Sequence, residues 1–149
     1  MRKQPTLRER ALRLLARREH SRAELARKLR TYAGPEEELE TLLEDLSRRG
    51  LLSDERYAES RAHALSRKYG AARIAHELRA KGLDKELAEQ ASKTARATEI
   101  ERAREVWCRK FRGVAPGTRE ERARQMRFLQ SRGFSFDAIR AVVGSPGED

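Results

Sequence analysis

The sequence predicts an all-α protein made of three tandem three-helix repeats that form an elongated, curved array. The main observation is a repeated phrase: residues 78–83 read Leu-Arg-Ala-Lys-Gly-Leu and residues 129–134 read Leu-Gln-Ser-Arg-Gly-Phe. A related segment ends at Leu29, so Leu29, Leu78 and Leu129 lie about 50 residues apart. Such a period is typical of an array of similar helical units. No segment shows the convincing apolar–polar alternation of a half-buried strand.

Each copy of the phrase is expected to end a helix. Glycine just past a helix adopts the left-handed conformation that caps the last carbonyls, and the next apolar residue folds back onto the final turn. Gly82 and Gly133 hold this position in two units, and Gly34 follows Leu29 in the first. Gly50 closes a further copy that is out of phase with the period, so we expect it to end a different helix.

The first repeat is predicted over residues 6–52. Thr6 is a suitable cap for its first helix, and Ser21 with Glu24 forms a capping box at the start of its second. A Gly-Pro pair then breaks the chain and places Pro35 in the first turn of a third, acidic helix. The apolar positions of these helices are Leu7, Ala11, Leu14, Leu15, Leu25, Leu29, Leu39, Leu42, Leu43 and Leu46.

The second repeat is predicted over residues 53–97. Its helices begin at Ser53 or Asp54, after Gly70, and at Asp84. Its apolar positions are Tyr57, Ala58, Ala62, Leu65, Ile74, Ala75, Leu78, Leu87, Ala88 and Ala91. Residues 92–98 alternate between polar and apolar types, and their pattern leaves a kink and a break equally open.

The third repeat is predicted over residues 98–144. Its first helix ends before a loop at residues 113–117, Thr118 opens a second helix with another capping box, and Ser135 opens the last. Its apolar positions are Ile100, Ala103, Val106, Trp107, Phe111, Met126, Phe128, Leu129, Phe134, Ile139, Val142 and Val143. The polar tail over residues 144–149 is expected to fray.

Composition favours thin helical layers over one large core. The chain has 149 residues, a net charge of +10, 39% charged residues and one tryptophan. Its single cysteine, Cys108, excludes an internal disulfide, and its place beside Trp107 favours a buried, inert thiol. The sequence has no apolar signal core and no long apolar run, so we expect a cytoplasmic protein without a membrane span.

No pattern of catalytic or metal-binding residues emerges. His20, His63 and His76 do not cluster and are expected at the surface or at helix ends. The acidic residues between 36 and 45 share one helix, which favours a solvated face over a cation site. The glycines of the 113–117 loop are not followed by the lysine of a phosphate-binding loop. We therefore expect no metal, no cofactor and no enzymatic activity.

Basic residues are the better candidates for a binding site. Arg10, Arg13 and Arg17 recur at three and four residues, which predicts one exposed ridge opposite the leucines of the same helix. Arginine suits phosphate and carboxylate because its guanidinium is a planar fork of donors. The candidate filament- or DNA-binding residues are Arg10, Arg13, Arg17, Arg22, Lys28, Arg30, Arg119, Arg122, Arg124 and Arg127. A solubilising role explains each single arginine equally well.

In its order of motifs the chain resembles the RecX family over roughly residues 8 to 143. The first unit carries Ala11, Leu12, Leu15, Arg18, Ser21, Glu24, Leu25, Lys28 and Leu29. The second carries Asp54, Tyr57, Ala58, Lys68, Tyr69, Gly70, Arg73, Ile74, Leu78, Lys81, Gly82 and Leu83. The third carries Ala103, Lys110, Phe111, Arg124, Phe128, Leu129, Arg132, Gly133, Phe134 and Ile139.

The resemblance implies a bacterial regulator of the recombinase RecA, active in DNA repair, homologous recombination and the SOS response. Such proteins bind along the groove of the RecA filament on single-stranded DNA. They commonly block filament extension and suppress ATP hydrolysis, strand exchange and coprotease activity. Weak, sequence-independent binding to single- and double-stranded DNA and a monomeric state are also expected. Two alternatives stay open: a nucleic-acid binder that acts without RecA, and an adaptor for an acidic protein.

Overall fold

The structure is a computed structural model, and it describes residues 3–144. Within that range the chain forms nine α-helices and no strand. They are α1 (Leu7–Arg17), α2 (Arg22–Arg30), α3 (Glu36–Arg48), α4 (Asp54–Leu65), α5 (Ala71–Ala80), α6 (Lys85–Ala97), α7 (Glu99–Phe111), α8 (Arg119–Ser131) and α9 (Phe136–Val143).

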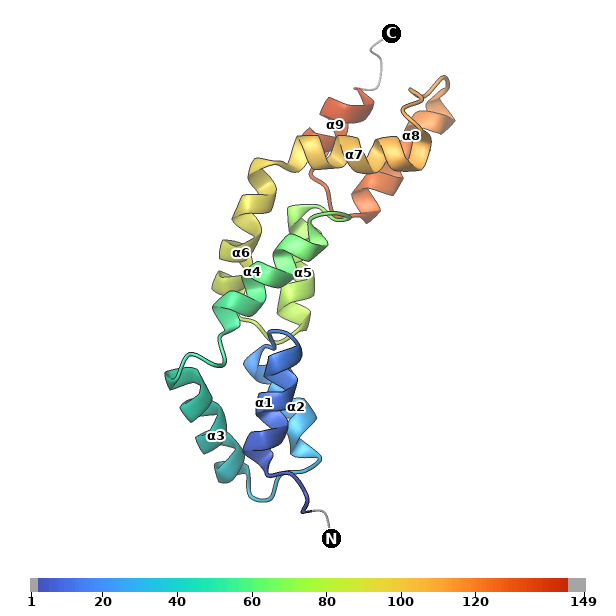
Figure 1. Ribbon diagram of the computed structural model, residues 1–149. Helices are drawn as coiled ribbons and strands as arrows, with labels where there is room; N and C mark the ends of the chain where they lie inside the picture. The colour runs from blue at the N-terminus through green and yellow to red at the C-terminus, as the bar shows by residue number, and fades with distance from the viewer. Residues whose placement is uncertain (1–2, 145–149) are drawn as a thin grey trace.

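The helices form three units, α1–α3, α4–α6 and α7–α9, which follow one another in an elongated, bowed array (Figure 1). The predicted all-α array of three-helix repeats is confirmed. Its proposed boundaries, 6–52, 53–97 and 98–144, stay predictions. The predicted tail, apart from Gly144, lies outside the described residues.

The predicted helix starts are correct wherever a polar side chain caps the helix. In each case the side-chain oxygen accepts a backbone N–H from the first turn, which satisfies one of the helix's free donors. The capping residues are Thr6, Ser21, Ser53, Asp84, Thr118 and Ser135. Pro35 differs from the prediction, because it is the extended N-cap residue of α3 and Glu36 holds the first helical position.

The ambiguity over residues 92–98 is resolved as a break at one residue. Helix α6 continues through Ala97, and α7 begins at Glu99, so only Thr98 is non-helical. Ser92 is fully buried, and its hydroxyl donates to the Glu89 carbonyl 2.9 Å away. The hydroxyl is thereby satisfied inside the helix, so the polar residue does not end it.

Each unit buries its own apolar cluster. The first is rich in leucine and includes Leu25, Leu39 and Leu43, all fully buried. The second centres on Ile74 and Leu78, and the third contains the remaining buried aliphatic and aromatic residues of the array. The three clusters are separate, so the units are joined mainly by other kinds of contact.

Two burial predictions are wrong. Cys108 is exposed rather than buried, because it lies on the outer side of α7. Ile100 is also exposed, at the first turn of the same helix. His20 lies at a helix end, between α1 and α2, which is one of its two expected placements, but it is only 1% exposed.

The two junctions between units share one geometry. At the first, Asp54 Oδ1 accepts the N–H of Arg22, the first residue of α2, at 2.7 Å. At the second, Glu99 Oε1 accepts the N–H of Ala71, the first residue of α5, at 2.7 Å. Asp54 and Glu99 are themselves the first residues of α4 and α7. An acid that opens one unit therefore binds the second helix of the unit before it.

The repeated phrase supplies the other half of each junction. At the first junction the hydroxyl of Ser21 donates to the carbonyl of Lys81 at 3.2 Å. At the second the N–H of Gly70 donates to the carbonyl of Arg132 at 2.8 Å. Gly82 and Gly133 follow these carbonyls with positive φ, as predicted.

Gly34 does not hold the predicted position. Hydrogen bonds align Ala33, not Gly34, with Gly82 and Gly133: each donates its N–H to the carbonyl three residues earlier, at 3.3 Å for Ala33 and 3.0 Å for both glycines. Gly34 is absent from the positive-φ residues of the described range. Unlike the second helices of the other two units, α2 therefore ends without a positive-φ glycine.

Candidate functional site

The alignment of the second helices reveals a surface that runs the length of the array. Tyr32, Lys81 and Arg132 each donate their N–H to the aligned buried leucine's carbonyl, at 2.9, 3.1 and 3.2 Å. Residues four and eight positions before them lie on the same helical face. We call this surface the second-helix strip, and it comprises Glu24, Lys28, Tyr32, Arg73, Glu77, Lys81, Arg124, Phe128 and Arg132.

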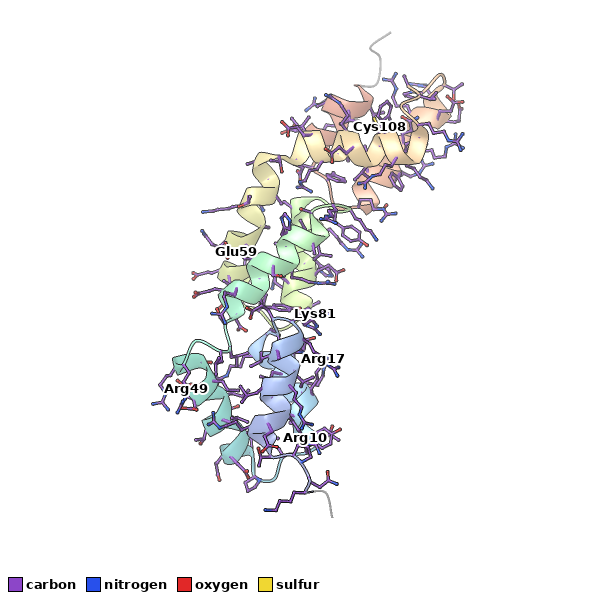
Figure 2. All side chains as sticks on the ribbon, viewed as in Figure 1. Arg10, Arg17, Arg49, Glu59, Lys81 and Cys108 are labelled. Atoms are coloured by element: carbon purple, nitrogen blue, oxygen red, sulfur yellow. The ribbon has the colours of Figure 1, made fainter. Side chains whose placement is uncertain are left out.

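The strip is continuous across the first junction. A groove of about 300 Å³ is lined from both units, by Glu24 and Arg18 on one side and by Arg61 and Lys81 on the other. In Figure 2, Lys81 lies close beyond Arg17, on the same flank of the molecule. Charges of both signs from the two units therefore line this groove, with Glu19 and Glu24 beside the three basic residues.

Across the second junction the strip combines cations with aromatic rings. The guanidinium carbons of Arg73 and Arg132 lie 5.0 and 5.7 Å from the centre of the Tyr69 ring. Arg132 also lies 5.1 Å from the Phe128 ring, and Lys110 lies 5.4 Å from that ring. Basic side chains over aromatic faces are typical of surfaces that bind nucleic acid, because they offer both charge and stacking.

The predicted arginine ridge is present on α1. Arg13 and Arg17 are exposed and Arg10 is half-buried. Arg10 and Arg17 lie along one flank of the unit, whereas Arg49, just past α3, lies on the opposite flank (Figure 2). The ridge does not lie opposite all the leucines, because Leu14 lines the same groove as the arginines. The prediction is wrong on that point, since position 14 is four residues past Arg10 and three before Arg17, which places it beside the ridge.

The candidates on α2 are largely engaged by acids. Arg22 pairs with Glu40 at 2.9 Å and with Glu44 at 3.3 Å, both on α3. Arg30 pairs with Glu36 at 3.1 Å. The acidic helix therefore neutralises this side of the first unit and leaves the α1 ridge as the unit's more strongly positive flank.

The remaining α2 candidate, Lys28, belongs to a polar cluster beside the first junction. Its Nζ lies 3.9 Å from Glu24 Oε2 and 3.0 Å from Nε2 of the buried His20. Arg18 holds the Glu24 carboxylate through two hydrogen bonds, at 3.0 and 2.7 Å. Glu24 thus binds Arg18 instead of completing the predicted reciprocal capping box with Ser21.

This cluster shifts two pKa values. The hydrogen bonds from Arg18 lower the pKa of Glu24 to about 2, and the charge of Lys28 acts in the same direction. Burial lowers the pKa of His20, since the charged imidazolium would lose its hydration there. The cluster is therefore built around an ionised carboxylate and a neutral imidazole.

The four candidates on α8 do not form one face. At about 100° per residue, Arg119 and Arg122 lie on one side of the helix and Arg124 and Arg127 on the other. Arg124 and Arg127 are exposed, whereas Arg122 is half-buried. Of the four, only Arg124 belongs to the second-helix strip.

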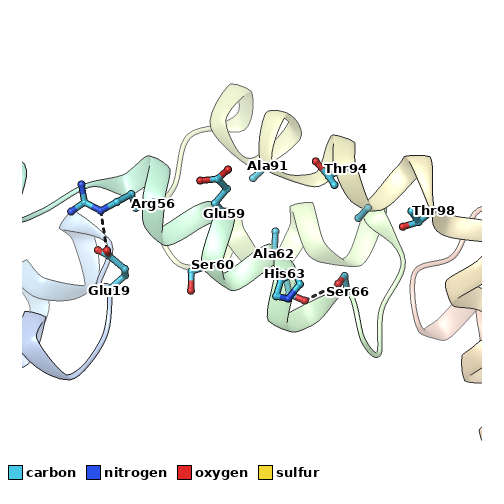
Figure 3. A pocket seen from close by; sticks show the side chains of 11 residues that line it. Glu19, Arg56, Glu59, Ser60, Ala62, His63, Ser66, Ala91, Thr94 and Thr98 are labelled. Atoms are coloured by element: carbon cyan, nitrogen blue, oxygen red, sulfur yellow. Dashed lines mark hydrogen bonds and ion pairs between the residues drawn. The ribbon is translucent and has the colours of Figure 1, made fainter.

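A larger hollow of about 850 Å³ lies between α4 and α6 and reaches Glu19 of the first unit (Figure 3). Arg56 pairs with Glu19 at 2.9 Å at one end. Small residues such as Ala62 and Ala91 line its middle. Its charges are mixed and partly paired, so its lining does not single out a ligand.

Neither a metal centre nor a membrane-spanning helix is found among the described residues. Among residues 3–144, no three His, Cys, Asp or Glu side chains are grouped as a metal ion requires. Over the same range, no helix is both long and apolar enough to span a membrane.

Sequence reasoning overlooked most of the strip. Lys28 and Arg124 are among the predicted candidates, but Arg73, Lys81 and Arg132 are not, and the rings of Tyr69 and Phe128 were not considered as contact residues. The signal was available, because superposing the repeated phrase aligns residues 73, 77 and 81 with residues 124, 128 and 132.

The chain matches family models for all three RecX domains in their natural order. The first three-helix domain matches residues 8–46, the second residues 53–91 and the third residues 97–143. These matches cover most of the chain and include the helices that form both junctions.

Curated relatives agree over nearly the full length. The chain is 51% identical to regulatory protein RecX of Leptothrix cholodnii over 95% of this chain and 90% of the relative. It is 42% identical to regulatory protein RecX of Herminiimonas arsenicoxydans, over 98% and 96%. It is 46% identical to the protein of the same name from Pseudomonas syringae pv. tomato, over 96% and 94%.

Solved structures share the fold. The crystal structure of RecX from Lactobacillus salivarius superposes with a TM-score of 0.77 at 23% identity, over 92% of each chain. A crystal structure titled regulatory protein RecX superposes with a TM-score of 0.78 at 22% identity, over 91% of this chain and 70% of the other. Three domain matches in order, relatives that cover both chains and the shared array lead to one conclusion: the chain belongs to the RecX family.

Proposed function

We propose that this protein regulates RecA by binding along the groove of the RecA filament on single-stranded DNA. In this proposal it inhibits filament extension, ATP hydrolysis, strand exchange and coprotease activity, and it works as a monomer in the cytoplasm. Membership of the RecX family and relatives named regulatory protein RecX support the regulatory role.

The observation that carries the proposal is the second-helix strip, which offers basic residues from all three units on one continuous surface. A filament repeats its protein and phosphate sites along its length, so modest contacts from linked units add through effective concentration. Phosphate contacts by lysine and arginine also make such binding sensitive to salt. The α1 ridge and the exposed α8 candidates add further positive charge at the two ends of the array.

The test is RecA ATPase activity on single-stranded DNA, with the full chain added below the RecA concentration. We expect the natural protein to inhibit. The double variant K81Q/R132Q, which removes two charges from the strip, should need roughly tenfold more protein for the same effect, as expected for lost phosphate contacts. The matched control R48Q/R49Q removes two charges from the opposite flank and should inhibit normally. An unaffected ATPase across a range of salt would overturn the proposal.

A second candidate is a sequence-independent nucleic-acid-binding protein that acts without RecA. The cations around Tyr69 favour it, since cationic side chains beside an aromatic ring can bind single-stranded nucleic acid without a partner protein. Tight, salt-sensitive DNA binding combined with no change in RecA activity would select this alternative.

A further inference from the structure

The outer flank of the first unit carries a groove between α1 and α2 of about 400 Å³. We call it the α1–α2 groove. Its lining residues are Arg10, Arg13, Leu14, Arg17, Lys28, Leu29, Thr31 and Tyr32. The lining thus combines two leucines with four cations and one tyrosine, and it contains no acid.

The groove keeps its cations available. Arg13 and Arg17 are exposed, and the guanidinium of Arg10 stacks over the Tyr32 ring at 3.7 Å. Tyr32 itself is 58% exposed. The nearest acid to Lys28 is Glu24, at 3.9 Å, and that carboxylate is already held by Arg18. Positive charge therefore surrounds an apolar floor at which Arg13, Arg17 and Tyr32 are exposed.

The opposite flank of the same unit shows what such a surface binds. There, α3 places Leu39, Leu43 and Leu46 into the core, all fully buried. Its glutamates meanwhile pair with arginines of α2, Glu40 with Arg22 and Glu36 with Arg30. An acidic helix with a leucine face is thus held by leucines beneath it and arginines at its edge.

We infer that the α1–α2 groove binds an acidic amphipathic helix of a partner protein. Its cations at positions 10, 13 and 17 span about 10 Å along α1, at 1.5 Å per residue, and follow the spacing of one helical face. Carboxylates on a facing helix would meet them, while an apolar side chain packs on Leu14. A nucleic-acid backbone would use the charges but would gain nothing from the leucine floor. The inference deepens the proposed function, on which it rests, by naming the chemistry of a protein contact.

The probe is a fluorescein-labelled peptide with the sequence of residues 36–47, Glu-Glu-Glu-Leu-Glu-Thr-Leu-Leu-Glu-Asp-Leu-Ser, titrated with the full-length protein. We expect saturable binding that weakens with salt. The double variant R13Q/R17Q should bind the peptide at least tenfold more weakly, and the control R48Q/R49Q should bind it unchanged. A peptide with its leucines replaced by alanine, or its acids by their amides, should also bind at least tenfold more weakly.

Equal binding of the peptide by R13Q/R17Q and by the natural protein would overturn the inference. An oligothymidylate titration separates the other class of ligand. We expect R13Q/R17Q to lose no more affinity for it than R48Q/R49Q does. A selective loss of oligothymidylate binding, with peptide binding intact, would assign the groove to nucleic acid and overturn the inference. Neither titration contains RecA, so failure here is distinct from failure of the ATPase test.

Discussion

The two junctions use one plan but differ in what holds them. At the first junction, side chains make the contacts: Ser21, Asp54 and the Glu19–Arg56 pair at 2.9 Å. A Cβ on Gly82 would come within 2.5 Å of Ala23 Cβ, with the backbone of Ala23 no nearer than 4.0 Å. This junction therefore depends on groups that can rotate and adapt.

At the second junction the backbones themselves touch. Gly70 and Gly133 approach so closely that a Cβ on Gly70 would overlap the backbone of Gly133, and one on Gly133 would overlap Arg73. Arg102 binds the carbonyls of Ser66 at 2.9 Å, Tyr69 at 2.6 Å and also Ala95. Burial lowers the pKa of Arg102, whose charge nonetheless serves these carbonyls.

The difference indicates at which junction the units can change their relative orientation. A junction in which backbones touch allows one arrangement, since main-chain atoms cannot change rotamer. A junction held by polar side chains allows several arrangements, since those side chains can. We therefore expect the second and third units to behave as one body and the first unit to move relative to them.

The largest expected effect comes from Gly70→Ala. The added methyl would overlap the Gly133 carbonyl, and overpacking against backbone should cost about 3 kcal/mol of unfolding free energy. Urea unfolding followed by the fluorescence of Trp107, the single tryptophan, should show early loss of the third unit. Gly34→Ala is the control, because its nearest neighbour is a flexible Glu38 oxygen at 3.4 Å, and it should shift stability by less than about 0.5 kcal/mol.

The linking acids give the next largest effect. Glu99 is 8% exposed and accepts the N–H of Ala71 and, at 3.2 Å, that of Ser135. Removing it by Glu99→Ala leaves the buried donor of Ala71 and the partly buried donor of Ser135 unpaired, so we expect a loss of about 2–3 kcal/mol. Asp54→Ala frees one half-buried donor and should cost about 1 kcal/mol. Equal losses in thermal unfolding would contradict the proposed difference between the junctions.

Acid should weaken the first unit through Glu24. Its pKa is about 2 when folded, below the ordinary 4.5, so its stabilisation is present above pH 4.5 and is lost as the pH falls toward 2. Because Arg18 is half exposed, we expect Glu24→Gln to cost only about 1–2 kcal/mol at pH 7. The stability difference between variant and natural protein should vanish near pH 2. Glu77 pairs with Arg73 and is more exposed than Glu24, so Glu77→Gln should cost less than about 0.5 kcal/mol.

His20 should add a smaller effect near neutral pH. Its folded pKa is lowered, so the unfolded chain binds a proton first and stability falls as the pH drops below about 6.5. Arg18, Lys28 and Glu24 are the charged groups that face it. In His20→Gln the urea midpoint of unfolding should fall less between pH 7 and pH 5 than it does in the natural protein. An equal fall in the variant would show that another group titrates in this range.

The smallest expected effect is a difference in the width of the distance distributions across the two junctions, not a change in stability. Spin labels on the exposed Cys108 and on E59C span the second junction, and labels on R49C and E59C, with Cys108→Ser, span the first (Figure 2). We expect a narrower distance distribution across the second junction. Similar widths for both pairs would show that the two joints are equally stiff.

Local signals predicted most of the fold. Caps such as Ser21 and Asp84 act within three residues, so the sequence shows them directly. The sequence did not place the break after Ala97. Polar residues from Ser92 onward allow an earlier end of the helix, but the Ser92 hydroxyl is satisfied inside it. The burial of His20 and the exposure of Cys108 depend on which neighbours cover each helix, which no local pattern records.

The candidate surface was harder to predict than the helices. Arg22 and Arg30 look like their neighbours in sequence, yet α3 brings glutamates from 6 to 22 residues away to pair with them. The second-helix strip arises only when units stack, since Arg132 meets the Tyr69 ring of the unit before it. The α1 ridge, in contrast, lies within one helix, and the spacing of its three arginines was sufficient to predict that they share one face.

The first residue of α1 is not the acid found at the start of the other two units. Helices α4 and α7 begin with Asp54 and Glu99, whereas α1 begins with Leu7. A second copy that offered its first unit to the start of α8 would present a leucine where the joints within the chain have a carboxylate. The hydrogen bond that links units within one chain thus has no counterpart in such a contact between chains.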